Sequence, residues 1–242
     1  RPGRNGYANS VVALRAATGD VAWSFQHIHH DVWDWDTPSQ PMLVDFPVGG
    51  RKVPAVVVLT KQSLVFVLNR DTGVPLVPVE ERPVPTDGVA GDALSPTQPF
   101  PVRPPPLMQT RLTPDDAFGL TFIDEAQCRR TIAGARHGDL FTPPSTDGWI
   151  MYPGSAGGMN WGGGAFDPAT GLLVTPLSRI GLYLKLVPKE QIPPAEGFDP
   201  TRGAPMGPPG LIAGTPYGIE QRILLGPTMI PCTKPPWATL VG

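Results

Sequence analysis

Short apolar runs separated by glycine-containing turns recur along this chain. Apolar residues crowd positions 11–14, an Ala-Thr-Gly-Asp turn follows, and apolar residues then alternate with others over 21–25. A β-branched run over 53–59 meets a short turn at 61–63, after which a second apolar run covers 64–68. Alternation and β-branched runs bounded by turns are typical of strands. The pattern therefore predicts two β-hairpins in the first third of the chain.

A turn containing Thr-Gly recurs at wide, regular spacing. The pairs begin at positions 18, 72 and 170, the last inside a third strand-turn-strand pattern over 162–177. The gaps of 54 and 98 residues are close to one and two units of about 50 residues. Helical periodicity of useful length is almost absent. The chain is therefore predicted to be all-β, a β-propeller or a similar array with about four strands per blade.

Two proline-rich segments interrupt this pattern. Residues 75–106 contain ten prolines, and residues 188–216 are rich in proline and glycine. Proline has no backbone N–H to donate to a sheet, so we expect both segments to be excursions over the surface rather than sheet. A disordered linker is the alternative.

Composition narrows the class of protein. The chain has 242 residues, 40% hydrophobic and 17% charged, with a formal net charge of −2. These values are typical of a globular protein, and the near-neutral charge gives no electrostatic reason to expect nucleic acid as a partner. No apolar run reaches the roughly 18 residues of a membrane-spanning helix. Because the chain begins at Arg1, we expect it to be a piece of a longer protein.

Cys128 and Cys232 are the only cysteines. Two cysteines cannot form the paired CxxC framework of a structural zinc site. A disulfide, which is typical of an exported protein, and two buried thiols are both open at this point.

Candidate chemistry concentrates in residues 25–36, FQHIHHDVWDWD. This stretch holds three of the four histidines, three aspartates and two tryptophans. A carboxylate such as Asp31 can act as a general base, although an aspartate here can also simply hold a turn. We expect Trp33 and Trp35 to be packing residues, and Asp34 to fix the loop through backbone hydrogen bonds.

A zinc site built from the three histidines is a weaker alternative. Zinc takes three or four converging ligands. His27 and His29 alternate on one face of a strand, His30 points away, and only Asp31 or the distant His137 could supply a fourth ligand. We therefore expect His30 to position Asp31 by hydrogen bonding or to line the substrate opening.

Several longer motifs resemble a known family. They are FQHIHHDVWDWDTPSQPMLVDF, VPAVVVLTKQSLVFVLNRDTG, SPTQP, YPGSAGGMNWGGGAFDPATGLLV, and GTPYGI followed by IPC and PPW. Together they are similar to the pyrroloquinoline-quinone (PQQ) dehydrogenases, most of all the membrane-bound glucose dehydrogenase type and then quinate dehydrogenase. The resemblance implies an eight-bladed propeller of four-stranded antiparallel blades. Residues 1–242 would be a partial propeller domain, about the C-terminal half.

The resemblance also implies roles for individual residues. Asp31 would be the catalytic base, Lys61 would hydrogen-bond the quinone oxygens, and Asn160 and Trp161 would contact PQQ. Gln62-Ser63 stand where family members often carry a small residue and a glycine. A divalent cation, usually calcium, accompanies PQQ in the family. Its ligands lie upstream of this segment, so we expect none in this chain.

The implied activity is PQQ-dependent oxidation of a sugar or polyol, such as an aldose to its lactone, by hydride transfer to the quinone. Electrons would pass to ubiquinone. The full-length protein would be periplasmic and membrane-associated through a further domain, and the isolated piece would be inactive. Two alternatives stay open. One is a non-catalytic periplasmic propeller scaffold, which should lack the base, the lysine and the Asn-Trp pair together. The other is a related quinoprotein alcohol or quinate dehydrogenase.

Overall fold

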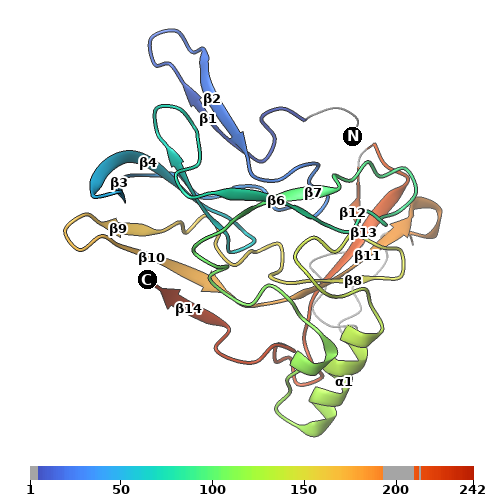
Figure 1. Ribbon diagram of the computed structural model, residues 1–242. Helices are drawn as coiled ribbons and strands as arrows, with labels where there is room; N and C mark the ends of the chain where they lie inside the picture. The colour runs from blue at the N-terminus through green and yellow to red at the C-terminus, as the bar shows by residue number, and fades with distance from the viewer. Residues whose placement is uncertain (1–4, 193–209, 213) are drawn as a thin grey trace.

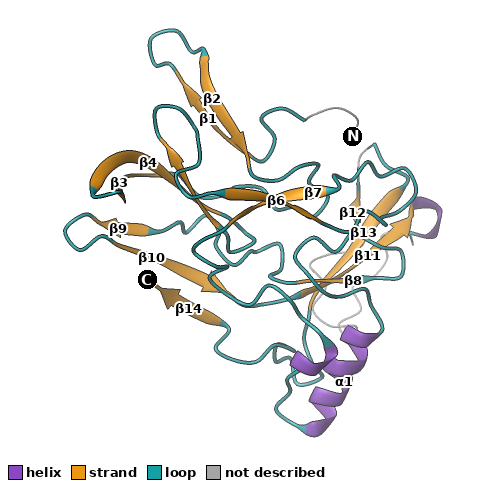
Figure 2. Ribbon diagram, viewed as in Figure 1, coloured by secondary structure: helices purple, strands orange, loops and turns teal. Residues whose placement is uncertain are grey.

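The computed structural model describes residues 5–192, 210–212 and 214–242. Strands dominate and helix is scarce (Figure 2). The helical elements are α1 (Phe122–Ala133) and the short 3-10 turns η1 (Pro114–Asp116) and η2 (Lys189–Gln191). The strands are β1 (Ser10–Leu14), β2 (Val21–Gln26), β3 (Met42–Val48), β4 (Arg51–Leu59), β5 (Val65–Asn69), β6 (Val79–Pro83), β7 (Thr97–Pro101), β8 (Trp149–Met151), β9 (Ala165–Asp167), β10 (Leu172–Ser178), β11 (Leu182–Pro188), β12 (Gly210–Leu211), β13 (Tyr217–Ile223) and β14 (Ala238–Val241).

All three predicted hairpins are present. The strand pairs β1–β2, β4–β5 and β9–β10 are antiparallel and adjacent in sequence. The glycines of the three Thr-Gly turns, Gly19, Gly73 and Gly171, have φ angles of 77°, 72° and 75°. Residues with a Cβ rarely adopt these angles, so glycine is the natural residue for such turns. Local turn chemistry thus accounts for the repeated motif.

The sheets depart from the expected series of four-stranded blades. Their orders are β1-β2, β3-β4-β5, β6-β7, β12-β13-β11-β8 and β14-β10-β9, so only one described sheet has four strands. Moreover, β9 and β10 lie between β8 and β11 in the chain but belong to a different sheet. Figure 1 shows the sheets spread round the molecule without closing into a ring. The all-β class is confirmed, but the regular blade order is not found.

The described part of the chain contains one α-helix, α1, which helical periodicity in the sequence did not predict. Thr121 caps it by accepting a hydrogen bond from the Asp124 amide at 3.2 Å, and the Asp124 side chain bonds back to Thr121. Only Asp124, Cys128 and Ile132 of this helix are buried, one residue per turn. Because the buried face of this helix is so narrow, its sequence shows little of the apolar periodicity that predicts a helix. The Thr-x-x-Asp capping box was the available signal. No helix in the described ranges is long and apolar enough to cross a membrane.

The first proline-rich segment contains sheet, contrary to expectation. β6 and β7 pair antiparallel, and the Val84 and Val102 amides donate to the carbonyls of Pro96 and Pro78 at the two ends of the pair. By alternation, the prolines inside these strands fall at positions whose nitrogens face away from the partner. Those prolines are Pro83, Pro99 and Pro101. The second segment also contains sheet, contrary to expectation: η2 follows the end of β11 at Pro188, and β12 pairs with β13. Residues 193–209 and 213 lie outside the described residues.

The β4–β5 hairpin lies at the centre of the hydrophobic core. Its side chains alternate between two buried clusters, one on each face of the sheet. Val57 and Val67 pack on one face with Ile150 and Leu177 among others. The other face contacts an aromatic group, and the cluster there consists of Trp33, Trp35, Val56, Val58, Phe66, Phe141 and Trp149 with neighbouring apolar residues. Burial on both faces explains why this segment is an almost continuous apolar run.

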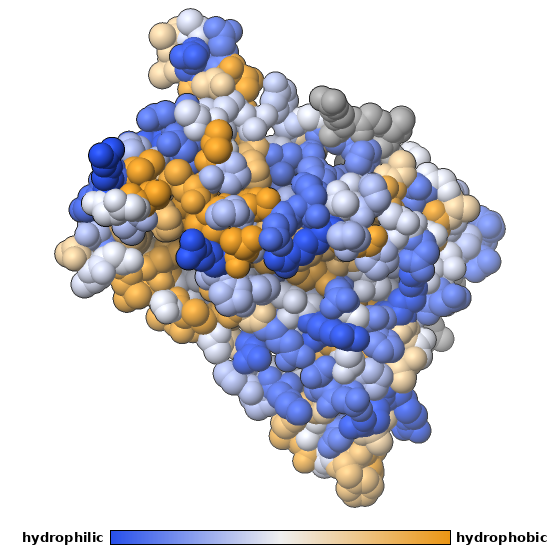
Figure 3. Space-filling model, viewed as in Figure 1, coloured by the Kyte–Doolittle hydropathy of each residue, from blue (hydrophilic) through white to orange (hydrophobic). Residues whose placement is uncertain are grey.

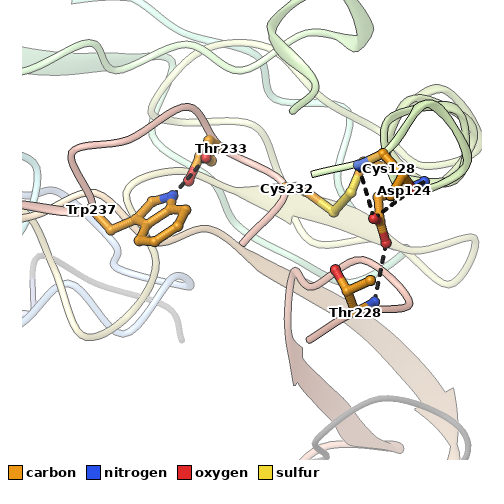
Figure 4. The surroundings of a disulfide bond; sticks show 7 residues. Asp124, Cys128, Thr228, Cys232, Thr233 and Trp237 are labelled. Atoms are coloured by element: carbon orange, nitrogen blue, oxygen red, sulfur yellow. Dashed lines mark hydrogen bonds between the residues drawn. A yellow bond between two sulfur atoms is a disulfide. The ribbon is translucent and has the colours of Figure 1, made fainter. Parts of the chain in front are cut away.

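A disulfide between Cys128 and Cys232 ties α1 to the segment that precedes β14 (Figure 4). On the same side of the helix, the Asp124 carboxylate accepts a hydrogen bond from the Thr228 amide at 3.1 Å. Both sulfur-bearing residues are buried. The disulfide alternative is therefore confirmed over the free thiols.

Removing this crosslink is expected to destabilise the chain. The two cysteines are 104 residues apart. Opening a loop of that size should lower the free energy of unfolding by about 4 kcal/mol, since the unfolded state regains conformational freedom. Denaturant unfolding of the Cys128→Ser/Cys232→Ser variant measures the change. Dithiothreitol should reproduce the loss in the parent chain and leave the variant unaffected. Equal stability of variant and parent would contradict the prediction.

Candidate active site

Asp31 lies at the start of a loop that its carboxylate holds together. Oδ1 accepts a hydrogen bond from the Trp33 amide at 2.8 Å, and Oδ2 accepts one from the Trp35 amide at 2.9 Å. The side chain of Asn9 donates a further bond to Oδ2 at 3.0 Å. The carboxylate is half-buried, with Trp33 and Trp35 packed behind it. The structure therefore gives Asp31 a fixed position and orientation.

Lys61 lies at the tip of the β4–β5 hairpin and is buried, with only 6% of its surface exposed to solvent. Its ammonium group donates to the Asp34 carbonyl at 2.8 Å and forms a close ion pair with the Asp36 carboxylate. The Asp34 carboxylate lies 3.6 Å away. A buried ammonium without such partners would be costly. Lys61 therefore anchors the 31–36 loop to the hairpin tip.

Lys61, the predicted cofactor contact, therefore acts electrostatically on Asp31, the predicted base, although no hydrogen bond or ion pair joins the two side chains in the described structure. Burial raises the pKa of the Asp31 carboxyl, against the hydrogen bonds from Trp33, Asn9 and Trp35 and the positive charge of Lys61. The positive charge of Lys61 also acts on Asp34, whose largely exposed carboxylate lies 3.6 Å from the ammonium group. Lys61 thus acts electrostatically on both carboxyls. The 31–36 loop thus holds a half-buried carboxylate within the electrostatic influence of a buried cation, which is an arrangement suited to proton transfer.

The expectation for Asp34 was wrong, and so was one of the two roles expected of His30; the other role of His30, lining the substrate opening, stays a prediction. Asp31, rather than Asp34, fixes the loop through backbone amides, while the Asp34 carboxylate is 76% exposed. His30 does not hydrogen-bond Asp31 in the described structure; its Nδ1 lies 3.2 Å from the Asn5 side-chain nitrogen. Asn9 makes the contact that was expected of His30. Nothing in the sequence singled out Asn9, because an asparagine just before a strand is an ordinary turn residue.

The histidines point to separate partners. His27 is buried beside Phe66, its Nε2 pairs closely with Thr37, and desolvation lowers its pKa from 6.5 to about 4. His29 lies between Gln26 at 2.7 Å and Glu81 at 3.1 Å. Over the described ranges, no three His, Cys, Asp or Glu side chains gather in a group that could hold a metal ion.

The tryptophans of the loop are core residues, as expected. Trp33 and Trp35 are stacked with ring centroids 5.8 Å apart, and both meet the edge of Phe141. The Trp33 indole donates to the Thr142 carbonyl at 2.7 Å. These contacts hold the loop against residues 141–142, within the buried cluster that also covers one face of the β4–β5 hairpin.

The glycine-rich loop before β9 packs against the hairpin tip. The Gly158 amide donates to the Lys61 carbonyl at 2.8 Å. A Cβ on Gly158 would overlap the Ser63 hydroxyl, and a Cβ on Gly157 would come within 2.8 Å of Lys61 Cγ. Close approach of two protein segments, rather than of a flat ligand, therefore requires these two glycines.

Asn160 and Trp161 lie further along this loop. The Asn160 side chain donates to the Ala156 carbonyl at 2.5 Å and accepts from the Trp161 amide at 2.8 Å, so its amide is used within its own loop. The Trp161 side chain is 83% exposed. In the described structure neither residue bonds to Asp31 or Lys61. The connection to Lys61 runs only through the backbone at Gly158.

Trp161 also borders a large apolar groove of about 1260 Å³ between β3 and the β9–β10 hairpin. Figure 3 shows apolar side chains exposed over this part of the surface. The groove is lined by apolar side chains of β3, β9 and β10, but neither Asp31 nor Lys61 contributes to it. The groove and the Asp31–Lys61 cluster are therefore different features.

Gly158→Ala tests whether the glycine loop needs its close approach. An added methyl group that overlaps Ser63 should lower the free energy of unfolding by about 2 kcal/mol, as overpacking does elsewhere. Adding Ser63→Gly should restore most of the loss, because it removes the overlapping hydroxyl and because residue 63 has a φ of 64°, which suits glycine.

Gly6→Ala is the matched control, since an added Cβ there meets nothing within 4 Å. Denaturant unfolding compares the three variants. A Gly158→Ala chain as stable as the Gly6→Ala chain would show that the loop does not depend on this contact.

Comparison with known proteins identifies relatives along the whole chain. Residues 1–242 match the family model "PQQ: Glucose/ethanol/alcohol dehydrogenase, beta-propeller domain". A probable quinate dehydrogenase (quinone) of Xanthomonas campestris pv. juglandis is 40% identical, with 97% of this chain and 30% of that protein covered. The quinoprotein glucose dehydrogenase of Escherichia coli strain K12 is 37% identical, with 98% and 30% covered. The glycerol dehydrogenase large subunit of Gluconobacter thailandicus is 40% identical, with 98% and 34% covered.

Solved structures give the same fold. A europium-containing methanol dehydrogenase matches with a TM-score of 0.50 at 20% identity, over 90% of this chain and 28% of its own. The quinohemoprotein alcohol dehydrogenase from Comamonas testosteroni matches with a TM-score of 0.50 at 22% identity, over 96% and 27%. The chain spans about a third of the length of the relatives it matches. With a family match from its first residue to its last, this chain belongs to the β-propeller family of the PQQ-dependent glucose, ethanol and alcohol dehydrogenases.

Proposed function

We propose that this chain carries the proton-accepting part of the active site of a PQQ-dependent dehydrogenase that oxidises a hydroxyl group of a sugar or polyol. The observation that supports the proposal is that Lys61 binds the loop that Asp31 begins and acts electrostatically on the Asp31 carboxyl. A half-buried carboxylate with a raised pKa beside a buried cation can accept an alcohol proton and keep the developing charge stable.

The residues present fit PQQ chemically. PQQ is planar and carries carboxylates and carbonyl oxygens, which call for a cation, hydrogen-bond donors and a flat apolar surface. Lys61 supplies the cation, and the exposed Trp161 ring supplies an aromatic surface. Next to Lys61, Gln62 Nε2 and Ser63 Oγ are buried without a hydrogen-bond partner. Buried polar atoms of this kind are costly unless a further group satisfies them.

Each residue then has a defined task. PQQ, when bound, accepts the hydride equivalent of the oxidation. Asp31 takes the proton of the substrate hydroxyl, and Lys61 places positive charge where negative charge gathers. Lys61 would have to share its ammonium between the cofactor and the carboxylate of Asp36. Asn160 would contact the cofactor only after releasing the hydrogen bond to Ala156.

The substrate class, acceptor and location rest on the relatives. The relatives are named for glucose, quinate and glycerol, which are all polyhydroxylated compounds. We therefore assign a sugar or polyol as the substrate and, for an aldose, a lactone as the product. The name of the Xanthomonas campestris relative includes "(quinone)", which supports ubiquinone as the electron acceptor. A disulfide supports an oxidising compartment such as the periplasm. We assign a calcium ion, its ligands, the missing blades and a membrane domain to parts of the full-length protein beyond this chain.

Quinate dehydrogenase is the second candidate activity, because identity to a quinate enzyme is 40% against 37% for a glucose enzyme. A non-catalytic scaffold would have no need of a buried lysine beside an aspartate of raised pKa.

Asp31→Asn is expected to lower turnover of the PQQ-loaded, full-length protein by about 10²–10⁴, the usual effect of losing a general base. Asparagine has one acceptor oxygen, whereas Asp31 accepts from Trp33, Trp35 and Asn9. PQQ titration and thermal unfolding must therefore accompany the rate measurement. Asp34→Asn, in the same loop but exposed, is the control. Near-normal turnover of Asp31→Asn with saturating PQQ and calcium would refute the assignment.

Lys61→Ala is expected to reduce turnover and also to weaken PQQ retention by about tenfold, because a charge-assisted contact to the cofactor is lost. Equilibrium dialysis of PQQ against the variant measures retention. Lys52→Ala, on the exposed part of β4, is the control. Unchanged PQQ affinity together with a destabilised fold would mean that Lys61 serves only to anchor the 31–36 loop.

A further inference from the structure

The side chain of Asn9 links Asp31 to the far end of its own loop. Asn9 immediately precedes β1, and its backbone carbonyl accepts a hydrogen bond from the His27 amide at 3.0 Å. One side-chain amide group donates both to Asp31 Oδ2 at 3.0 Å and to the Trp35 carbonyl at 2.9 Å. Both of its N–H donors are thus used. The other two donors to Asp31 are backbone amides of the loop itself.

The bonds are divided unequally between the two oxygens of Asp31. Oδ2 accepts from Asn9 and Trp35, which fills its two acceptor positions. Oδ1 accepts only from the Trp33 amide, so one acceptor position is left on that atom. A proton arriving from a substrate hydroxyl is therefore taken up most easily by Oδ1.

We propose that Asn9 is a positioning residue for the proton transfer: it holds Oδ2, keeps the Asp31 carboxylate ionised and leaves Oδ1 to accept the substrate proton. The inference rests on the proposed function in that Asp31 is taken to be the base. Asn9 itself touches neither the substrate nor the cofactor in this scheme.

The charges around Asp31 allow Asn9 to have this effect. Burial raises the pKa of Asp31, and the hydrogen bond from Asn9 is one of the interactions that lower it. Lys61 faces the carboxylate with a positive charge, and Asp34 faces it with a negative one. His30, adjacent in sequence, bonds to Asn5. Without the hydrogen bond from Asn9, less would counteract the effect of burial on the pKa of Asp31. The pKa would rise, and Asp31 would be protonated at higher pH.

The test compares pH profiles in the full-length, PQQ-loaded protein. Turnover should fall as pH drops through the pKa of Asp31, because a protonated carboxyl cannot accept a proton. In Asn9→Ala this acidic limb should move to higher pH, with turnover about tenfold below the parent on the limb and close to it well above the limb. The control is Asn5→Ala, which also removes an asparagine side chain, but one that pairs with His30 rather than with Asp31. It should leave the acidic limb of the pH profile in place.

A second measurement does not need the enzyme to be active. Carbodiimide couples to protonated carboxyl groups, so the pH dependence of Asp31 labelling in the PQQ-free protein, followed by mass spectrometry, reports its protonation. Asn9→Ala should extend labelling to higher pH. Asn9→Asp has the same shape, and its negative charge should extend labelling further.

The outcomes separate the two hypotheses. An inactive parent protein with shifted labelling in the Asn9 variants would overturn the proposed function and leave the effect of Asn9 on Asp31 intact. A uniform fall in turnover at every pH, or labelling that does not move in either variant, would overturn the role of Asn9.

Discussion

Burial of the β4–β5 hairpin on both faces is the constraint from which the candidate site follows. Alternating side chains of this hairpin enter two separate clusters, so neither strand can slide or turn over without exposing a row of valines and leucines. The hairpin tip is fixed in consequence. It places Lys61 at 6% exposure, where its charge must be neutralised within the protein.

The buried ammonium group then determines the path of the neighbouring loop. Lys61 draws in the Asp34 carbonyl and the Asp36 carboxylate, and Asp31 closes the same loop from its other end. The loop is stacked on its far side by Trp33 and Trp35 against Phe141. Hydrophobic packing therefore sets the position, and charge sets the orientation, of the groups that we assign to catalysis.

What the sequence predicted correctly was local. The hairpins and their Thr-Gly turns follow from residues close together in the chain, because a positive φ and a β-branched run act over a few residues. The split of β9 and β10 from β8 and β11 depends on long-range pairing, which turn spacing does not encode. The prolines of β6 and β7 led to the wrong prediction that this segment is not sheet. Their nitrogens face away from the partner strand, and this depends on the pairing register rather than on composition.

The site shows the same division. The family motif brought out Asp31 and Lys61, and in the structure Lys61 binds the loop that Asp31 begins. Asn9, in contrast, is 22 residues away from Asp31 in sequence and carries no motif. The glycines at 157 and 158 lie close to the hairpin tip, which the sequence did not reveal. A glycine in a sequence can indicate that another group approaches the backbone closely, but only the three-dimensional structure identifies that group.

Hydrogen bonds alone do not separate a catalytic aspartate from a structural one, since Asp31 holds a turn as other aspartates of this chain do. Asp124 caps α1, and its hydrogen bond from Thr121 lowers its pKa; at Asp167 the hydrogen bond from Thr170 does the same. Asp31 accepts three hydrogen bonds as well, but burial outweighs them and its pKa is raised. A purely structural aspartate gains by staying ionised. Desolvation raises the pKa of Asp92 as well, so the raised pKa does not by itself single out Asp31. We base the assignment of Asp31 as general base on the raised pKa together with the three hydrogen bonds that fix its carboxylate.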